Sequence, residues 1–520
     1  MVNRENEPGQ GQRPGRRFFP PEALFFLAAW IGCAVAFRSR GLADPGTLWH
    51  VRVGELIFRD GIMRTDPFTF PFAGRTWIPQ QWGGECLMAL AHGVGGFDTI
   101  LLGFSLLIAG LFTGIFRRFL AGGMGVPLAA VAAGFALVAA GFHFYARPHM
   151  ATIVLMAVVA AFLVDFDRGW LTLRRMAWLI PIHAVWTNIH GGMLGGLFTM
   201  GLAALGWGGT FVLKKDSPLR SWTEVAGMAA LIALCAVTMF VNPIGLELQR
   251  TWFRIVGSPA MAAFVAEHSP LDPTREGDQA VLLFALFYAA LLFSVGFRRW
   301  RVTWLLPVVW FVLTLKGIRQ GPLFVVVGAV VAADIWPHTA WYRWLKASGD
   351  SLTRDPADVL PKIGWPGRTI PGILIAVALV SQAARVPLPV IGSGWAKLDS
   401  PAMPMDMVEP LQAFARTVPA GTPIYNDMNF GGFVIYFAPT LKNFGDDRFE
   451  LCGDEWLTDY VETIGKHPER FDGWQRRYGF TTALLSTSEP REPLEEYLIQ
   501  SSRWQRIAQG RTAALYQLRP

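Results

Sequence analysis

The stretch ADPGTLWHVRVGELIFRDGIMRTDPFTF, residues 43–70, follows the first long apolar run of the chain. It places acids, a histidine and several aromatic side chains between two hydrophobic segments. Within it, Trp49, Val53, Leu56 and Ile57 are spaced as one face of a helix. This spacing predicts an amphipathic helix that lies in a membrane interface, with Trp49 as its aromatic anchor. The stretch therefore predicts that polar groups are held at the edge of a membrane.

The composition places the chain in the membrane class. Of its 520 residues, 52% are hydrophobic and only 16% are charged, whereas soluble domains carry about 25% charged residues. The net charge of +7 comes from small clusters at the ends of apolar runs and not from one patch, so a role in binding nucleic acid is rejected. Apolar runs long enough for a span predict about eleven transmembrane helices, an α-helical polytopic fold. The predicted spans are 21–37, 99–116, 124–142, 150–165, 177–190, 192–212, 222–241, 279–297, 302–316, 321–336 and 369–386.

Changes in composition divide the chain into three parts. Residues 1–20 are predicted to be a disordered tail, 21–386 a transmembrane domain with a first outer loop at 38–98, and 387–520 an α/β domain. The last part mixes charged residues with short β-rich pieces. Four pieces predict strands and one predicts a helix: TPIYND, FVIYFA, TTALLS and TAALYQL for the strands, and GDEWLTDYVETI for the helix.

Lys and Arg residues fall in every second loop. The positive-inside rule places these loops and the N-terminus in the cytoplasm. With an odd number of spans, the first outer loop and the C-terminal domain are then both extracytoplasmic. We expect a multi-pass protein of the bacterial inner membrane, with its polar chemistry on the outer face.

Asp44 stands at the outer end of the first span. From there a carboxylate can reach both a lipid headgroup and a soluble acceptor, and it could serve as a general base. The alternative is structural, because Asp-Pro steps such as Asp44-Pro45 and Asp66-Pro67 commonly begin helices and turns. Both interpretations stay open at this point.

Four other outer loops carry polar residues at the ends of spans. Each residue taken alone is explained by turns, helix caps or snorkelling. Together they suggest a cavity, because polar groups at membrane depth are costly and tend to line pathways or sites. Its cations suit a phosphate-bearing lipid. The residues are His143, Arg147 and His149 in FHFYARPHM, Asn188 and His190 in WTNIHGG, Asn242 and Glu247 in VNPIGLELQR, and Lys316 and Arg319 in LKGIRQGP.

The C-terminal domain has its own cluster of charges. Its acids could bind a sugar or a cation, but they lack the Gly and Glu frame of a calcium loop. Turns and helix caps are therefore the favoured explanation. The residues are Asp427, Asp446, Asp447, Arg448 and Asp454.

The ordered series DPGTLWHVRVGELIFRDGIMRTDPFTF…GRTWIPQQWGGE, RPHM, WTNIHGG, NPIG, KGIRQGPLF, YNDMNFGGFVIY and GDDRFELCGDEWLTDY resembles a bacterial group of multispanning proteins. This group is placed near the GT-C, dolichyl-phosphate-mannose-mannosyltransferase-like glycosyltransferases. The resemblance implies a helix bundle, a base in the first outer loop, a polyprenyl-phosphate-linked sugar donor and a soluble C-terminal domain. By position, it implies Asp44 as the catalytic acid and assigns substrate binding to His50, Asp66, Arg147, His149, Asn188, His190, Lys316 and Arg319.

Gly46 is a departure from this family. Relatives often carry a second acid two residues after the first, and residue 46 is a glycine here. Without a paired-acid motif the sequence predicts no metal or other cofactor, although a divalent cation stays an open alternative.

The function expected from the sequence is an inverting membrane glycosyltransferase. Its donor would be a polyprenyl-phosphate sugar, and its acceptor an envelope glycan, lipid or protein. An outer-face site has no supply of nucleotide sugars, and the chain has no Rossmann or P-loop glycine signature. The alternatives are a lipid or polysaccharide transporter and a non-catalytic scaffold. A transporter would carry polar residues through the span centres, which are nearly uncharged here.

Overall fold

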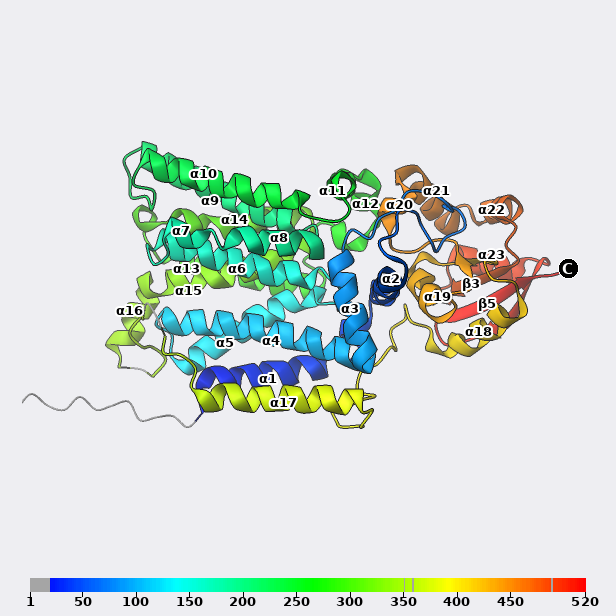
Figure 1. Ribbon diagram of the computed structural model, residues 1–520, viewed down its shortest axis with the longest axis horizontal. Coiled ribbons are helices and arrows are strands. Elements are labelled where there is room, and N and C mark those ends of the chain that lie inside the picture. Colours follow the sequence, from blue (N-terminus) through cyan, green and yellow to red (C-terminus); the bar gives the residue numbers. More distant parts are fainter. Residues whose placement is uncertain (1–18, 350, 358–359, 488–489) are drawn as a thin grey trace, which may run out of the picture.

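The computed structural model describes residues 19–349, 351–357, 360–487 and 490–520. It consists of an elongated helix bundle with a smaller α/β domain at one end (Figure 1). Nearly all of the predicted tail, residues 1–18, lies outside the described residues.

The membrane domain is a bundle of long helices that run along a common axis (Figure 1). Within the described ranges, seven helices are long and apolar enough to cross a membrane, and two shorter apolar helices accompany them. Each of the predicted apolar segments corresponds to a helix of this bundle, so the polytopic α-helical prediction is confirmed. The helices are α1 (Pro21–Ala36), α4 (Phe97–Ala121), α5 (Val126–Ala140), α6 (Met150–Asp167), α8 (Leu179–Ile189), α9 (Met193–Val212), α10 (Trp222–Val237), α13 (Glu276–Phe293), α14 (Leu306–Lys316), α15 (Gly321–Ile335) and α17 (Trp365–Ala383).

Helix α15 is the core of the bundle. All of its residues are buried, and it packs against α6, α4, α14, α5 and α13. Its sequence, GPLFVVVGAVVAADI, is apolar on every side until Asp334, which is the pattern of a helix surrounded by other helices. The surrounding helices leave many large apolar side chains exposed, including Leu205, Leu283 and Leu286, as expected of surfaces that face lipid.

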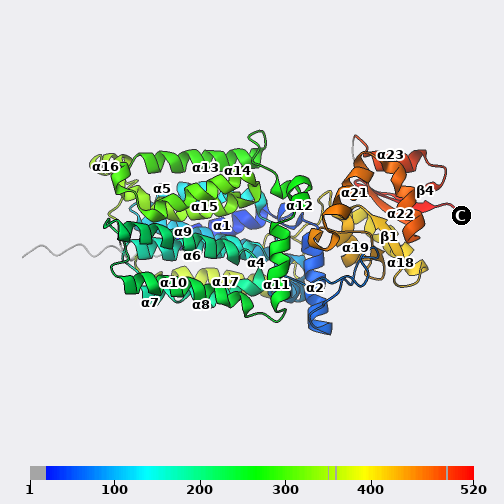
Figure 2. The ribbon, with the colours of Figure 1, turned by 90° about the horizontal axis from the view of Figure 1, so that it is seen from above.

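Short helices separate the bundle from the α/β domain. They are α2 (Gly46–Asp60), α3 (Trp82–Gly95), α11 (Leu246–Val256) and α12 (Pro259–Phe264). Helices α2 and α11 lie across the bundle axis (Figure 2). The four short helices form a layer between the ends of the spans and the C-terminal α/β domain.

The prediction of an amphipathic helix at α2 is confirmed, but the predicted role of Trp49 as a membrane anchor is wrong. Trp49 is only 4% exposed and belongs to an aromatic cluster shared with the C-terminal domain. Helix α2 packs between α3 and α19 (Gly431–Phe437). An apolar helix face can be covered by lipid or by protein, and periodicity cannot distinguish these two coverings.

The C-terminal domain is built on a five-stranded sheet with the order β2-β1-β3-β5-β4. Strand β1 pairs in parallel with β2 and β3, and β5 pairs antiparallel with β3 and β4. The strands are β1 (Pro423–Asn426), β2 (Lys442–Asn443), β3 (Thr482–Ser486), β4 (Trp504–Gln509) and β5 (Ala513–Leu518). The remaining helices of the chain are α7 (Leu173–Met176), α16 (Ala340–Ala347), α18 (Val408–Thr417), α20 (Phe449–Cys452), α21 (Asp454–Gly465), α22 (Phe471–Tyr478) and α23 (Pro493–Gln500).

Most of the predicted elements of this domain are confirmed. TPIYND, TTALLS and TAALYQL contain β1, β3 and β5, and GDEWLTDYVETI forms α21. The strand predicted at FVIYFA is wrong, because this segment belongs to helix α19. Short, wholly buried apolar runs have no polar face to reveal their period, so helix and strand look alike there.

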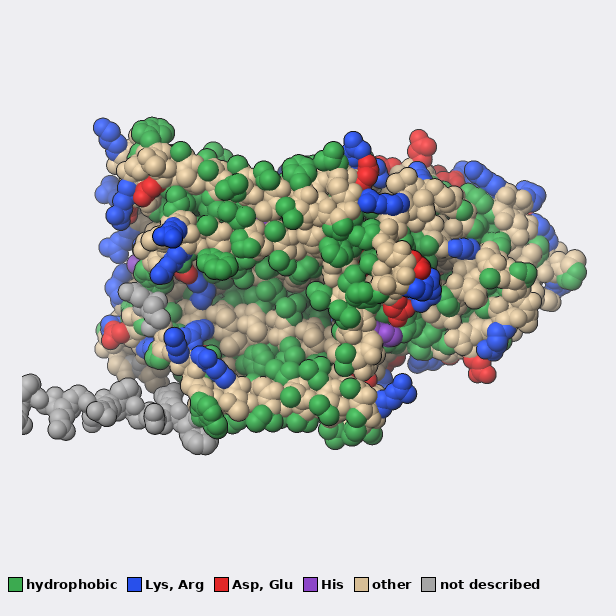
Figure 3. All heavy atoms as spheres, viewed as in Figure 1, with side chains coloured by type: hydrophobic (Ala, Val, Ile, Leu, Met, Phe, Trp, Pro, Cys, Tyr) green, Lys and Arg blue, Asp and Glu red, His purple; other side chains and the backbone are tan. Residues whose placement is uncertain are grey.

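The two ends of the bundle differ in charge. Lys and Arg side chains gather at the end away from the α/β domain, at the left of Figure 3. The predicted clustering of the basic loops at one end is therefore observed. Exposed tryptophans accompany them and suit an interfacial belt: Trp178, Trp222, Trp341, Trp344 and Trp365. Which end faces the cytoplasm remains a prediction.

Candidate functional site

Asp44 lies immediately before α2, between the bundle and the C-terminal domain. Its Oδ1 accepts a hydrogen bond from the backbone N–H of Gly46 at 2.7 Å, which is the local turn chemistry that its Asp-Pro context predicted. Its Oδ2 accepts a hydrogen bond from Arg147 Nη1 at 2.9 Å. The carboxylate therefore has a structural contact on one oxygen and a long-range ion pair on the other.

Arg147 is the centre of a group of charges. It lies in the loop between η2 (Gly141–His143) and α6. Besides Asp44, its guanidinium is 3.6 Å from the Asp447 carboxylate and 3.9 Å from that of Glu267. Three carboxylates from three separate segments thus converge on one cation. We call Asp44, Arg147, Glu267 and Asp447 the outer cluster.

Asp447 comes from the C-terminal domain, just after β2. Its Oδ1 accepts a hydrogen bond from Trp49 Nε1 at 2.6 Å, so α2 holds both acids. Strands β1, β2 and β3 are parallel, and the carboxyl edge of such strands is where open α/β sheets place ligand-binding groups. The domain meets the membrane bundle through this edge.

Burial and neighbouring charge shift the pKa values of the cluster. Burial raises the pKa of Asp447 to about 7, with Arg147 opposing the shift and Asp44 adding to it. Burial also raises the pKa of Asp44, again opposed by Arg147. For Glu267, burial is outweighed by His143, Arg147 and Arg319, which bring its pKa to about 2. The cluster holds one readily exchanged proton near neutral pH.

Arg319 is the second cation of the site. It lies on η7 (Ile318–Gln320), and its Nη1 donates to His268 Nε2 at 3.0 Å. The imidazole must be neutral to accept this bond. Arg319 also lies within electrostatic range of Glu267, Arg147 and Asp44. Its contact with a neutral partner leaves its charge available to an anion.

Two predicted histidines lie beside the outer cluster as neutral imidazoles. The ring of His149 is 5.2 Å from that of His143 and 6.5 Å from that of His190. Burial, with Arg319 and Arg147 adding to it, lowers the pKa of His190 to about 3. Burial likewise lowers the pKa of His149 well below its usual value. They can donate or accept hydrogen bonds but add no charge.

His50 and Asp66 lie outside the outer cluster, in buried pairs. His50 Nδ1 lies 3.1 Å from Glu85 Oε1, and neither side chain is more than 1% exposed. Asp66 binds Arg448 Nη1 at 2.8 Å, and both of these side chains are fully buried. These contacts join α2 to α3 and the first outer loop to the C-terminal domain. Their geometry supports positioning of the site more than contact with substrate.

The last two predicted residues lie apart from the cluster in different ways. Asn188 accepts a hydrogen bond from Trp82 Nε1 at 3.0 Å and donates to the carbonyls of Ala184 and Val241. It thus ties α8 to α3 and to the end of α10. Lys316 is exposed at the end of α14.

Sequence reasoning missed two members of the outer cluster. Asp447 was assigned to turn chemistry, because the sequence cannot show that the domain folds back onto α2. Glu267 lies on η4 (Ala266–His268), in a loop that was not singled out. The available signal was the Glu267-His268 pair, two ionisable residues following the apolar run MAAFVA.

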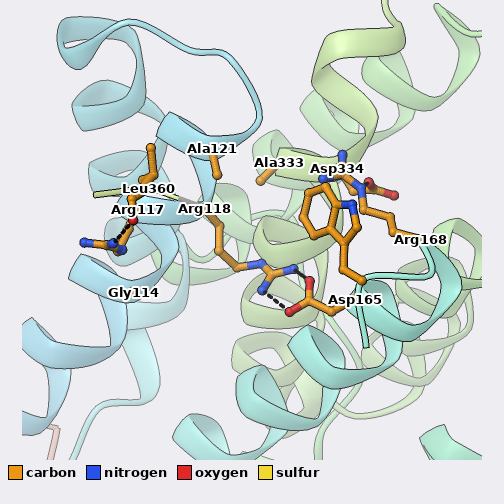
Figure 4. A pocket seen from close by; sticks show the side chains of 10 residues that line it. Gly114, Arg117, Arg118, Ala121, Asp165, Arg168, Ala333, Asp334 and Leu360 are labelled. Carbon is orange, nitrogen blue, oxygen red and sulfur yellow. Dashed lines mark hydrogen bonds and ion pairs between the residues drawn. The ribbon is translucent and has the colours of Figure 1, made fainter. Parts of the chain in front are cut away.

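A charged pocket lies at the opposite end of the bundle from the outer cluster (Figure 4). It has a volume of about 290 Å³ and is lined by residues from α4, α6 and α15. Arg118 binds Asp165 at 2.6 Å, and Arg168 binds Asp334. Among the described residues of the whole chain, no group of three or more His, Cys, Asp or Glu side chains is arranged to hold a metal ion.

No protein-family model matches this sequence, and a search of curated proteins found no match. Solved structures define the class of the fold: it is that of the GT-C-type multispanning membrane glycosyltransferases, as the sequence resemblance implied.

Two of the similar structures are crystal structures of the oligosaccharyltransferase of Archaeoglobus fulgidus. Its complex with Zn and sulfate aligns with 90% of this chain and 67% of its own, at a TM-score of 0.53 and 12% identity. Its apo form aligns with 90% of this chain and 69% of its own, at a TM-score of 0.51 and 12% identity. At such low identity the likeness establishes the fold, and the reaction has to be argued from the site.

Proposed function

We propose that this protein is an integral membrane glycosyltransferase. It transfers a sugar from a polyprenyl-phosphate-linked donor to a glycan, lipid or protein of the cell envelope, on the outer face of the inner membrane. The fold of an oligosaccharyltransferase supports this class of reaction.

The observation that carries the proposal is the outer cluster and its neighbour Arg319. A carboxylate, Asp44, is held by Arg147 where the spans meet the soluble domain. Arg319 stands close by with a neutral imidazole as its hydrogen-bond partner. A carboxylate able to act as a general base and a cation suited to a phosphate thus lie near one another, and this supports the proposal.

In the proposed reaction, the acceptor hydroxyl loses its proton to the carboxylate of Asp44. Its oxygen forms a bond to the anomeric carbon as the bond from that carbon to the phosphate oxygen breaks. The electron pair leaves with the polyprenyl phosphate, and Arg319 stabilises the added negative charge. The configuration at the anomeric carbon is inverted, because there is a single displacement.

A transport role has less support than transfer. A transport pathway requires polar groups through the middle of the membrane domain. Helix α15, at the centre of the bundle, is buried and carries only apolar residues from Gly321 to Ala333. The ionisable groups described above lie at the ends of the helices.

The test is transfer of radiolabelled sugar from polyprenyl-phosphate donors to envelope material, in membrane vesicles that contain the full chain. We expect Asp44→Asn to lower the rate by about 10²–10⁴-fold, the usual contribution of a general base. Asp60→Asn is the matched control, because Asp60 ends the helix that Asp44 precedes, is exposed and pairs with its neighbour Arg59. Full activity in Asp44→Asn would remove the proposed base.

A further inference from the structure

The carboxylates of Asp44, from the membrane domain, and Asp447, from the C-terminal domain, both lie beside Gly46. An oxygen of Asp44 and an oxygen of Asp447 lie 2.7 and 2.9 Å from the position that a Cβ atom on Gly46 would occupy. Both carboxylates contact the guanidinium of Arg147, at 2.9 and 3.6 Å. Two acids this close, sharing one cation, interact strongly in their ionisation.

Gly46 makes this approach possible. It is the first residue of α2 and does not have a positive φ, so its backbone would accept other residues. A Cβ there would also lie 2.9 Å from Arg147 Cζ, closer than real contacts allow. The space beside residue 46 is therefore filled by a carboxylate that arrives from the C-terminal domain.

We propose that Asp44 and Asp447 act together as one catalytic carboxylate pair, which is complete only when the C-terminal domain is seated on the membrane domain. This inference rests on the proposed transferase function and adds a second acid to its site. The pair takes the proton of the acceptor hydroxyl on one of its oxygens and later releases it to water. Asp447 thereby becomes a residue of the reaction and not only of the domain interface.

The surroundings of the pair favour one shared proton near neutral pH. The charged and titratable groups that face it are Arg147, Glu267, Arg319, Tyr145 and Asp446. Repulsion between two acids opposes ionisation of both, and the pair's second proton leaves at a pH near 7, the value to which burial raises the pKa of Asp447. A base is most effective when its pKa lies near the working pH.

The first test is the pH dependence of sugar transfer by the full-length protein in vesicles. We expect the wild-type rate to rise with pH and to level off above about pH 7, as the pair loses its second proton. Asp447→Asn removes one like-charged neighbour of Asp44, while Glu267 stays in place. The acidic limb should then move to lower pH, and the plateau rate should fall about tenfold because a single carboxylate is the weaker base.

The second test moves the acid to the other domain. In Gly46→Asp with Asp447→Ala, the second carboxylate comes from α2, in the space vacated by Asp447. We expect this double variant, in which Asp44 and Arg147 still have to shift away from the new Cβ, to regain the neutral limb and part of the rate, whereas Gly46→Asp alone stays more impaired because Asp447 crowds the same space as well. Gly93→Ala is the control for glycine replacement, since a Cβ there meets nothing within 4 Å, and the exposed Asp459→Asn is the control for acid loss.

The outcomes separate the two proposals. If Asp44→Asn abolishes transfer while Asp447→Asn changes neither the rate nor the pH profile, the carboxylate pair is overturned and the transferase stands. If the wild-type protein transfers no sugar, the proposed function falls and the pair falls with it. Recovery by the double variant supports the pair in a way that a purely structural role of Asp447 does not predict.

Discussion

Arginines meet carboxylates at both ends of the helix bundle, but in different ratios. In the pocket of Figure 4, Arg118 has Asp165 as its partner and Arg168 has Asp334. At the end that contacts the C-terminal domain, one guanidinium faces three carboxylates. In the first arrangement each of these two arginines has one carboxylate partner, whereas in the second the three carboxylates outnumber the two cations, Arg147 and Arg319.

This difference separates a structural role from a functional one. A one-to-one pair satisfies both charges and holds helices together, here α4 to α6 through Arg118 and Asp165. Burial, with the neighbouring carboxylates Asp44 and Asp446 adding to it and Arg147 opposing it, raises the pKa of Asp447 to about 7, and such shifts are a property of sites that exchange protons. The comparison predicts that equivalent substitutions at the two ends have opposite consequences for activity and stability.

The largest effect is expected from Arg147→Gln. Removing this guanidinium leaves Asp44, Asp447 and Glu267 to repel one another and disturbs the proposed base. We expect transfer to fall by about 10²–10³-fold, the loss typical of removing one preorganised electrostatic contact. The measurement is the initial rate of labelled sugar transfer per amount of folded protein, determined by size-exclusion chromatography in detergent.

Arg118→Gln is the matched control at the other end. It removes a guanidinium from an equally close pair, and its activity per folded protein should stay within about threefold of wild type, because nothing at that end takes part in the reaction. A comparable loss of transfer in Arg147→Gln and Arg118→Gln would show that the number of carboxylates around each arginine does not distinguish the two ends of the bundle.

The second prediction concerns stability and is centred on Asp334. This side chain is 2% exposed, pairs with Arg168 and accepts a hydrogen bond from Trp304 Nε1 at 2.6 Å. Arg168→Gln leaves it buried without its cation, which costs about 3–5 kcal/mol in comparable pairs. Thermal unfolding in detergent should show a clear fall in melting temperature.

A second substitution tests whether the missing charge is the cause. Arg168→Gln combined with Asp334→Asn removes both charges and should recover most of the lost stability. A double variant as unstable as the single one would mean that packing of the Arg168 side chain on Trp170, 4.0 Å from the ring centre, matters more than its charge.

The sequence was sufficient for the membrane domain but not for the joint between domains. Long apolar runs such as the one that became α15 have a single physical solution, a buried or lipid-facing helix, so the bundle could be predicted. The interface between the two domains depends on which surface of the membrane domain packs against which surface of the C-terminal domain. Trp49 looked like a membrane anchor, and Asp447 looked like a turn residue, because neither partner is a sequence neighbour.

The candidate site was predictable in part for the same reason. Asp44 and Arg147 both lie at span ends on the side of the bundle that contacts the C-terminal domain, so their convergence followed from topology, and the structure brings them to 2.9 Å. His50 and Asp66 belonged to the same loop but turn toward Glu85 and Arg448. Topology assigns residues to an end of the bundle. Only packing decides which of their side chains join the outer cluster.

The smallest predicted effects compare two cations on the same turn, both expected from the sequence to bind substrate. Arg319→Gln should raise the donor KM by at least about tenfold, because a charge-assisted bond to phosphate contributes about 1.5–3 kcal/mol. Lys316→Gln should change it by less than about twofold, since this exposed side chain ends α14. Kinetics with varied donor concentration check both. A larger effect at Lys316 would place the lipid phosphate at the rim of the bundle, away from the outer cluster, and would weaken the argument that the charge ratio marks the site.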